Sequence, residues 1–253
     1  MNAPSWSDLI EAKVTPGHPF FALIDQAYRV FACPKPESIG VCERCCMDRE
    51  IEADFFSSPI RQLPLRYVRD WYFAAYQPPG VPKETWAYLL PRILEILAFG
   101  EDVGSAGIEV SLSRYETGNP DNWSTREWAV IDQFQRAFLT HKIEHGDDRL
   151  DDVLCMFGLA GWSLGDLIDQ VRLIDDATLA ERFWNDWCHD HVPGREGIWV
   201  TAFWEGSANS TLFEFYASKE LHVRMAKLAL ADGTEPSLSE RAAAVASVIE
   251  KAS

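Results

Sequence analysis

The sequence predicts an all-α protein, either an irregular helical bundle or a HEAT-like α-solenoid of about ten to twelve helices. Apolar residues recur at three- and four-residue spacing along most of the chain, the period of an amphipathic helix. Capping patterns precede two of these stretches, Ser124 with Glu127 and Ser163 with Asp166. Of the 253 residues, 47% are apolar and 12% aromatic, which is enough to form a core.

The predicted helices follow one another with short connections and show no repeat of fixed period. In chain order they cover residues 20–31, 48–57, 65–76, 83–99, 125–145, 147–161, 163–174, 177–188, 210–217, 219–231 and 237–251. Together they predict a single domain over residues 1–253, with a soft division near residues 146–148.

Three stretches depart from simple helical periodicity. Residues 33–46 contain two prolines and a glycine and predict an extended loop. Pro91 lies in the middle of the apolar segment 83–99 and predicts a kink, because an interior proline removes a helical hydrogen bond. Residues 198–204 are β-branched and aromatic enough for a strand, but no pairing partner follows, so we expect helix or irregular structure.

The charge balance restricts the classes of partner. Thirty-nine acidic residues against 23 Lys and Arg give a formal net charge of −16. Such a surface repels phosphate backbones and anionic lipid, which argues against nucleic acid and membrane surfaces as partners. It suits solubility alone, or a basic protein partner. No apolar run reaches the ~20 residues of a membrane helix and no signal-peptide pattern is present, so a cytoplasmic protein is expected.

The cysteines give the most specific local pattern. Cys42, Cys45 and Cys46 form a Cys-x-x-Cys-Cys cluster, and Cys33 lies nine residues upstream. A Cys-x-x-Cys pair can bring two thiolates to one tetrahedral zinc ion. We therefore name Cys33, Cys42, Cys45 and Cys46 as ligands of a structural zinc. Plain structural cysteines and redox chemistry are the alternatives, and the helical context argues against a thioredoxin-type motif.

Two segments carry a resemblance to a known family. Residues 31–37 read Phe-Ala-Cys-Pro-Lys-Pro-Glu and lead into Gly40-Val41-Cys42 and Cys45-Cys46; residues 89–95 read Leu-Leu-Pro-Arg-Ile-Leu-Glu. This resembles an uncharacterised bacterial family with an aromatic-Pro-x-Pro stretch, a Cys-rich turn and a later Leu-Pro-Arg helix. In that family the position of Cys33 is often aromatic, which argues against Cys33 as a ligand. The resemblance implies no activity.

Two further clusters look catalytic. His141, Glu144 and His145 fit His-x-x-Glu-His, in which two histidines one helical turn apart bind a metal beside a carboxylate base. Their place at a predicted helix end offers a simpler explanation, since late histidines complement the helix dipole. Residues 188–191, Cys-His-Asp-His, are potential metal ligands or a nucleophile with its base. Adjacent helical residues point in different directions, so a polar helix end is the prediction.

For the other noticeable groups of residues, the sequence predicts a structural role and no part in catalysis or binding. The acids of residues 147–152 are expected to cap a helix, and the aromatics of residues 184–204 to pack in the core. The sequence thus favours a non-enzymatic acidic helical protein that binds another protein, with an immunity or antitoxin role as one example. A zinc-stabilised fold is compatible with this function. A metal-dependent hydrolase using the His-x-x-Glu-His helix is the alternative.

Overall fold

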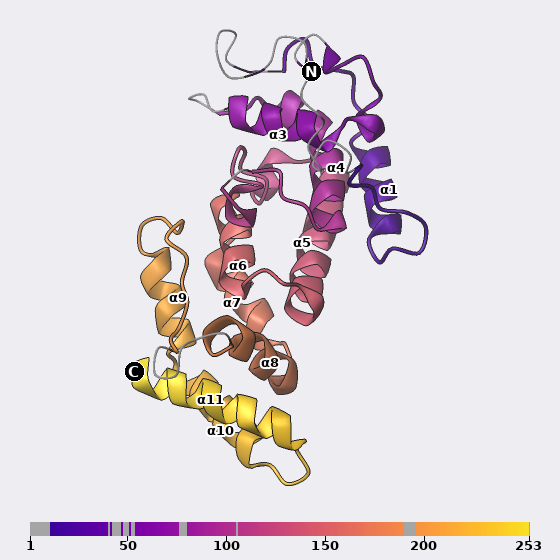
Figure 1. Cartoon of the computed structure of the whole chain (residues 1–253). Coiled ribbons are helices and arrows are strands. Elements are labelled where there is room, and N and C mark those ends of the chain that lie inside the picture. Colours follow the sequence, from indigo (N-terminus) through magenta and orange to yellow (C-terminus); the bar gives the residue numbers. More distant parts are fainter. Residues whose placement is uncertain are drawn as a thin grey trace, which may run out of the picture. The chain divides into compact units, whose positions relative to one another are not determined.

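The chain forms helices joined by short irregular connections (Figure 1). The computed structural model describes residues 11–39, 41, 47, 51, 54–75, 80–104, 106–189 and 196–252. Over these residues, all regular secondary structure is α-helix or 3-10 helix, and no strand occurs. Two compact units divide the chain, Met1–Gln135 and Arg136–Ser253. None of the described helices is long and apolar enough to cross a membrane.

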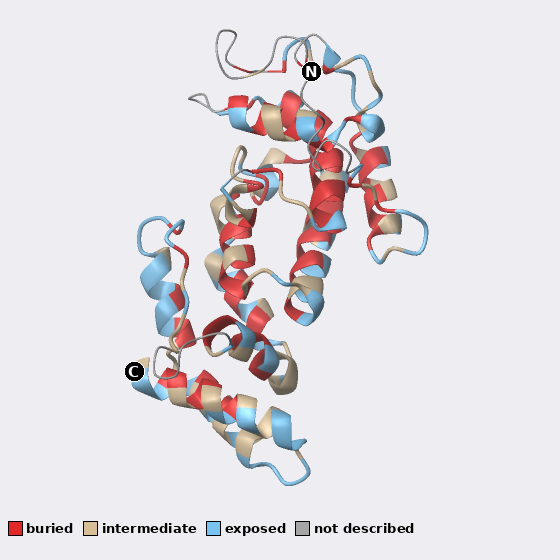
Figure 2. Cartoon of the chain, viewed as in Figure 1, coloured by how far each residue is buried: buried red, intermediate tan, exposed pale blue. Residues whose placement is uncertain are grey.

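The first unit is organised around α4 (Lys83–Phe99), and both α1 and η2 pack against this helix. Every residue from Thr85 to Ala98 is buried (Figure 2), as expected of a helix that is apolar on all sides. Its last turn closes at Gly100, whose φ of 101° is left-handed. The other elements of the unit are α1 (Phe21–Val30), η2 (Ile60–Gln62), α3 (Leu65–Ala74), η3 (Ile108–Val110), η4 (Pro120–Asn122) and the first part of α5 (Thr125–His145).

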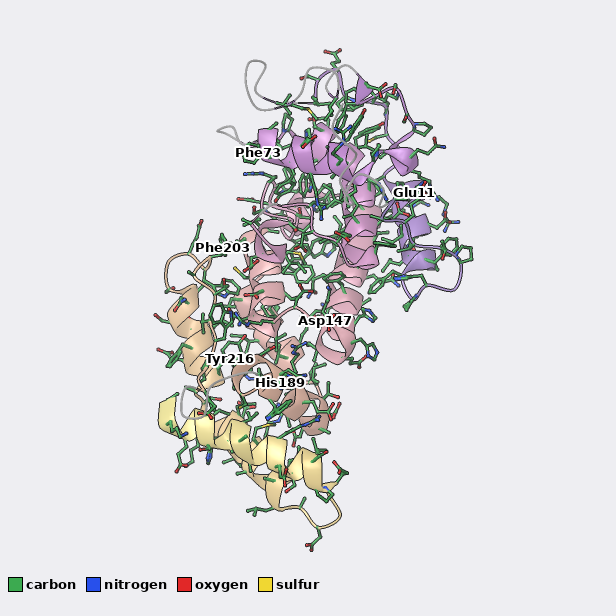
Figure 3. The ribbon with its side chains drawn as sticks, viewed as in Figure 1. Glu11, Phe73, Asp147, His189, Phe203 and Tyr216 are labelled. Carbon is green, nitrogen blue, oxygen red and sulfur yellow. The ribbon has the colours of Figure 1, made fainter. Side chains whose placement is uncertain are left out.

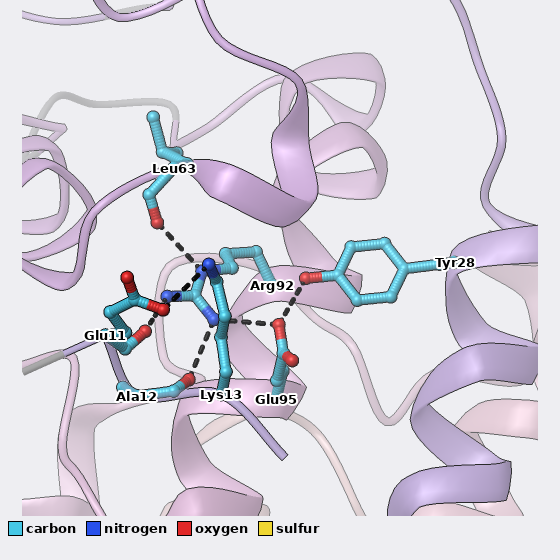
Figure 4. Close-up of polar contacts among 7 residues, drawn as sticks. All are labelled: Glu11, Ala12, Lys13, Tyr28, Leu63, Arg92 and Glu95. Carbon is cyan, nitrogen blue, oxygen red and sulfur yellow. Dashed lines mark hydrogen bonds and ion pairs between the residues drawn. The ribbon is translucent and has the colours of Figure 1, made fainter. Parts of the chain in front are cut away.

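A buried arginine on α4 holds the irregular parts of this unit (Figure 4). The Arg92 side chain donates to the carbonyl oxygens of Glu11 (2.6 Å), Ala12 (2.8 Å) and Leu63 (2.9 Å). It also donates to Glu95 at 2.7 Å, and the Tyr28 hydroxyl donates to the same carboxylate oxygen at 2.6 Å. Burial, followed by the charge of Glu95, raises the pKa of Tyr28 above its usual value. Arg92 thus joins α4 to α1 and to two irregular segments.

Over its described residues, the second unit contains the end of α5 and six further helices. They are α6 (Leu150–Leu159), α7 (Leu164–Arg172), α8 (Asp176–Trp187), α9 (Ala208–Tyr216), α10 (Lys219–Leu230) and α11 (Pro236–Ala252). Helices α10 and α11 lie side by side, both pack against α8, and α6 packs against α7 and α8. Side chains of Ser163, Asp175 and Ser218 cap α7, α8 and α10 by accepting backbone N–H groups.

Most predicted helices are confirmed, with ends that differ by three residues or fewer. The capping box of α5 is present: Ser124 N–H donates to Glu127 at 2.8 Å, and Glu127 N–H donates to the Ser124 hydroxyl at 3.3 Å. The predicted helix 48–57 lies partly outside the described residues. Residues 83–99 form one helix, and the kink at Pro91 stays a prediction. Residues 196–204 have neither helix nor strand, as expected.

One confirmed helix starts two to three residues later than predicted. Asp147 or Asp148 was expected to open the sixth helix, but Arg149 precedes its first residue, Leu150. The Asp148 carboxylate instead pairs with Lys142. The Leu150 N–H is satisfied by Asp186, a residue 36 positions later that no local pattern could identify.

Candidate functional site: an aromatic segment fixed by a buried carboxylate

The irregular connection between α8 and α9 combines buried and exposed aromatic side chains. We refer to residues 196–204 as the 196–204 segment. Thr201 and Trp204 are buried, whereas Trp199 and Phe203 each expose 40% of their surface. Phe203 is labelled near the start of α9 in Figure 3. The segment therefore displays large aromatic groups although it has no regular structure of its own.

A single buried carboxylate fixes the conformation of this segment. Asp151, in the first turn of α6, is only 3% exposed. Its Oδ2 accepts the Thr201 backbone N–H at 2.7 Å and the Trp204 indole N–H at 3.1 Å. Its Oδ1 accepts the Tyr216 hydroxyl of α9 at 3.0 Å. Asp151 thereby connects α6, the 196–204 segment and α9.

Packing reinforces these hydrogen bonds. The Trp204 ring lies directly against Gly158 of α6, where a Cβ atom would stand 2.2 Å from Trp204 Cζ3. Real Cβ atoms do not approach other atoms so closely, so Trp204 requires a glycine at this position. The Asn209 amide also donates to the Thr201 carbonyl at 3.3 Å. Contacts from α6 and α9 thus hold the buried residues of the segment.

Burial controls the electrostatics of this carboxylate. Desolvation raises the pKa of Asp151 to about 6, although the hydrogen bonds from Thr201, Tyr216 and Trp204 lower it. Burial, then the negative charge of Asp151, raises the pKa of Tyr216 well above its usual value. At neutral pH an ionised Asp151 therefore faces three donors, and the Tyr216 hydroxyl keeps its proton.

A second buried pair holds the start of α6. Arg182 donates to Asp186 Oδ1 at 2.6 Å, and the Leu150 N–H donates to Asp186 Oδ2 at 3.0 Å. Arg182 also donates to the Gly146 carbonyl at 2.6 Å. Burial raises the pKa of Asp186, while the charge of Arg182 opposes that rise. This pair orients the helical turn that carries Asp151.

The residues that carry the exposed aromatics include acidic but no basic side chains, although one arginine from the start of α6 contacts an exposed ring. Residues 196–216 contain three glutamates and no Lys or Arg. Phe213 of α9 adds a third aromatic side chain that is 40% exposed. Arg149 stacks on the Trp199 ring at 3.9 Å from its centroid, and the Trp199 indole N–H donates to Asp152 at 3.3 Å. Among these described groups, no nucleophile is paired with a base.

The predicted zinc ligands are only partly within the described residues. Cys42, Cys45 and Cys46 lie outside them. Cys33 is exposed and lines a cavity of about 650 Å³ between residues 33–38 and the first turn of α4. Burial of its thiol raises the pKa of Cys33. Over the described part of the chain, no three His, Cys, Asp or Glu side chains converge as a metal site, and the structural zinc stays a prediction.

The His-x-x-Glu-His residues lie at the exposed end of α5. The rings of His141 and His145 are 5.1 Å apart, and His145 Nε2 is 3.7 Å from Glu144 Oε2. Catalytic zinc ordinarily takes three protein ligands. The described residues bring no third ligand to these histidines.

The Cys-His-Asp-His run divides between described and undescribed residues. Cys188 is half-buried, and desolvation raises the pKa of its thiol to about 11, so it is protonated at neutral pH. The His189 ring stacks on Trp184 at 4.7 Å. Asp190 and His191 lie outside the described residues. The described half carries no activated nucleophile.

Sequence reasoning missed the residues that build the aromatic site. Asp151 was assigned to helix capping with its acidic neighbours, and Trp199 and Phe203 were assigned to the core. Asp151 does lie in the first turn of α6, as predicted, but its carboxylate is also buried and accepts from three donors. The expectation that Trp199 and Phe203 lie in the core is wrong, since both are exposed. Comparison of the chain with protein families, curated proteins and solved structures finds no match.

Proposed function

We propose that this chain is a non-enzymatic helical protein that binds another protein through the 196–204 segment and α9. The observation that carries the proposal is the display of Trp199 and Phe203, each 40% exposed, on a segment fixed by the buried Asp151. A flexible loop can change its backbone conformation and so remove its aromatic side chains from water. Here buried hydrogen bonds hold the backbone that presents them.

Such an arrangement has the physical properties of a binding surface. Large aromatic residues contribute a disproportionate share of the energy at protein interfaces. A segment that is already ordered loses less conformational entropy on binding than a flexible loop does. Fixing the segment by a carboxylate and by the Gly158 contact therefore favours recognition of a matching surface.

Charge indicates the chemistry of the partner. The absence of Lys and Arg from residues 196–216, together with Glu196, Glu205 and Glu214, makes this region acidic. A partner with Lys or Arg beside an apolar pocket would complement it, and basic side chains can also stack on the exposed rings. The net charge of −16 would accelerate the approach of a basic partner.

The proposal also covers the cellular compartment of the protein and the arrangement of its helices. Cys33, Cys155 and Cys188 form no disulfide among the described residues, which fits a reducing compartment such as the cytoplasm. An irregular bundle or HEAT-like stacking of the helices would suit a binding scaffold. An immunity- or antitoxin-like role, in which an acidic protein neutralises a basic one, is a concrete form of this function.

The test compares two triple variants of the full chain. Trp199→Ala, Phe203→Ala and Phe213→Ala remove the exposed aromatics of the site. Phe73→Ala, Leu173→Ala and Leu230→Ala remove apolar groups elsewhere that are more exposed still, and they serve as the control. Partners captured by the wild-type protein from its own cytosol are identified, purified and titrated against all three proteins.

We expect the site variant to bind at least about tenfold more weakly than wild type, and the control to bind within about twofold. Affinity for the wild-type protein should fall as salt is raised, because the partner is basic. Circular dichroism confirms that each variant is folded. Unchanged binding by the folded site variant, or affinity that is insensitive to salt, would refute the proposal.

A further inference from the structure

Helix α10 of the second unit (Figure 1) presents a row of basic and aliphatic side chains to solvent. Lys219, Val223, Lys227 and Leu230 follow one another at intervals of four, four and three residues, so they share one face of the helix. All four are exposed, and Val223 and Leu230 expose 37% and 85% of their surface. Other faces of α10 pack against α8 and α11. We refer to these four residues as the α10 stripe.

The two lysines of the stripe are available to a partner. Arg224, on a neighbouring face of α10, is engaged within the chain: its Nε donates to Asp176 at 2.6 Å, and its other nitrogens donate to backbone carbonyls. Lys219 and Lys227, in contrast, form no ion pair with any carboxylate that the structure describes. Their charge can therefore attract a negatively charged surface.

The protein-binding surface has the complementary chemistry. It is acidic, since residues 196–216 contain three glutamates and no Lys or Arg. It also carries the aromatic side chains that are 40% exposed, those of Trp199, Phe203 and Phe213, which we call the aromatic surface. The aliphatic groups of the stripe can pack on these rings, and its lysines can pair with the glutamates or stack on the ring faces.

The net charge restricts where two copies of this chain can meet. Each copy carries a formal charge of −16, so most orientations of approach are repelled. Helix α10 contains three Lys and Arg residues against one Glu, so it is locally basic in an acidic protein. An acidic surface of a second copy can therefore approach α10 where it would be repelled by most of the molecule.

We propose that a second copy of this chain is a partner of the protein-binding surface, with the α10 stripe of each copy bound to the aromatic surface of the other. The dimer rests on the proposed protein-binding function, since it uses the same aromatic residues. Because each chain carries both surfaces, a two-fold axis forms both contacts at once and closes the assembly. A basic partner of higher affinity displaces the second copy, because both bind the same side chains.

Sedimentation velocity of the full chain over about 5–500 µM measures this association. We expect a reversible dimer with a Kd of about 10–200 µM, the range of a small and transient interface. Lys219→Glu with Lys227→Glu should raise this Kd at least about tenfold, because it places acids opposite the acidic surface. The control is Lys83→Glu with Arg126→Glu, two exposed residues of the first unit; it changes the net charge equally and should raise the Kd less than about threefold.

A mixing experiment tests which surfaces meet. The α10 double variant keeps its aromatic surface, and the triple variant Trp199→Ala, Phe203→Ala and Phe213→Ala keeps its α10 stripe. Mixed in equal amounts, they regain one of the two contacts, so the mixture should associate at least about threefold more tightly than either variant alone. A dimer in which two α10 stripes met each other would give a mixture no tighter than the triple variant by itself.

Circular dichroism checks that each variant is folded. A wild-type protein that stays monomeric up to about 500 µM, equal weakening by the control, or no gain on mixing would overturn the proposed dimer. Titrations of the captured partner use about 1 µM chain, where the dimer is a minor species, so Leu230→Ala in their control does not disturb them. Failure of self-association therefore leaves the test of the protein-binding function intact.

Discussion

Replacing Asp151 by asparagine is expected to change how the stability of the protein depends on pH. The carboxylate is 3% exposed, and burial raises its pKa from 3.8 to about 6 in the folded protein. Between these two values the folded state binds more protons than the unfolded state. The contribution of Asp151 to stability is therefore complete below pH 3.8 and is lost as pH rises through about 6.

The size of the effect follows from the shift. A difference of about two pKa units corresponds to roughly 3 kcal/mol, since each unit is worth about 1.4 kcal/mol. Asparagine has nearly the same shape but does not titrate. The unfolding free energy of wild type minus that of Asp151→Asn should thus fall by roughly 2–3 kcal/mol between about pH 4 and about pH 7.

The assay is urea denaturation of both proteins across this pH range, followed by circular dichroism. Asp186 also has a raised pKa, but it is present in both proteins, so its contribution largely cancels in the difference. Asp169→Asn, which removes an exposed carboxylate paired with Arg172, is the control and should shift stability by less than about 0.5 kcal/mol. A difference that is flat with pH, or that rises with pH, would refute the reasoning about Asp151.

Three further changes test other parts of the structure. Gly158→Ala should lower the free energy of unfolding by about 1–3 kcal/mol, because the new methyl group overlaps the Trp204 indole ring. The control is Gly165→Ala, where the nearest atom to the new Cβ is 3.6 Å away, and it should be neutral or stabilising. Both are measured by urea denaturation. Arg92→Met should lower the free energy of unfolding by about 3–5 kcal/mol, because a buried carboxylate and three carbonyl groups lose their hydrogen-bond donor. A loss below about 1 kcal/mol would contradict the role of Arg92 in holding these groups. Protein purified without chelator should carry about one zinc per chain by mass spectrometry, lost in Cys42→Ser or Cys45→Ser, and metal-free protein with all thiols free would end the zinc hypothesis.

Helices were predictable from the sequence because their signals are local. Apolar spacing and the capping box at Ser124 predicted α5 to the residue, and the strongly apolar run of residues 83–99 predicted α4. The start of α6 was not predictable in the same way. Its first N–H is satisfied by Asp186, which becomes a neighbour only when α8 packs beside α6. A contact between residues 36 positions apart produces no local pattern in the sequence from which it could be predicted.

The aromatic site escaped prediction for a related reason. Trp199, Phe203 and Trp204 look alike in the sequence, yet only Trp204 is buried, because it alone meets Gly158 and Asp151. Asp151 is likewise indistinguishable from its neighbour Asp152 in the first turn of α6. Which of two adjacent carboxylates faces the core depends on the rotation of α6, and the Asp186–Arg182 pair contributes to setting it.

In each unit a buried charged side chain binds the backbone of an irregular segment, and the two charges are of opposite sign. An irregular segment cannot satisfy its own backbone groups, so those that are buried need a partner from elsewhere. In the first unit the cationic Arg92 donates hydrogen bonds to the carbonyl oxygens of residues 11–12 and 63. In the second unit the anionic Asp151 accepts the backbone N–H of Thr201. Each charge stands on a helix packed within its unit, and each holds a segment that has no secondary structure. Loss of either charge should therefore first release its segment to hydrogen exchange, with the helices protected for longer. Because only the segment held by Asp151 displays the exposed aromatics, only that release should weaken partner binding.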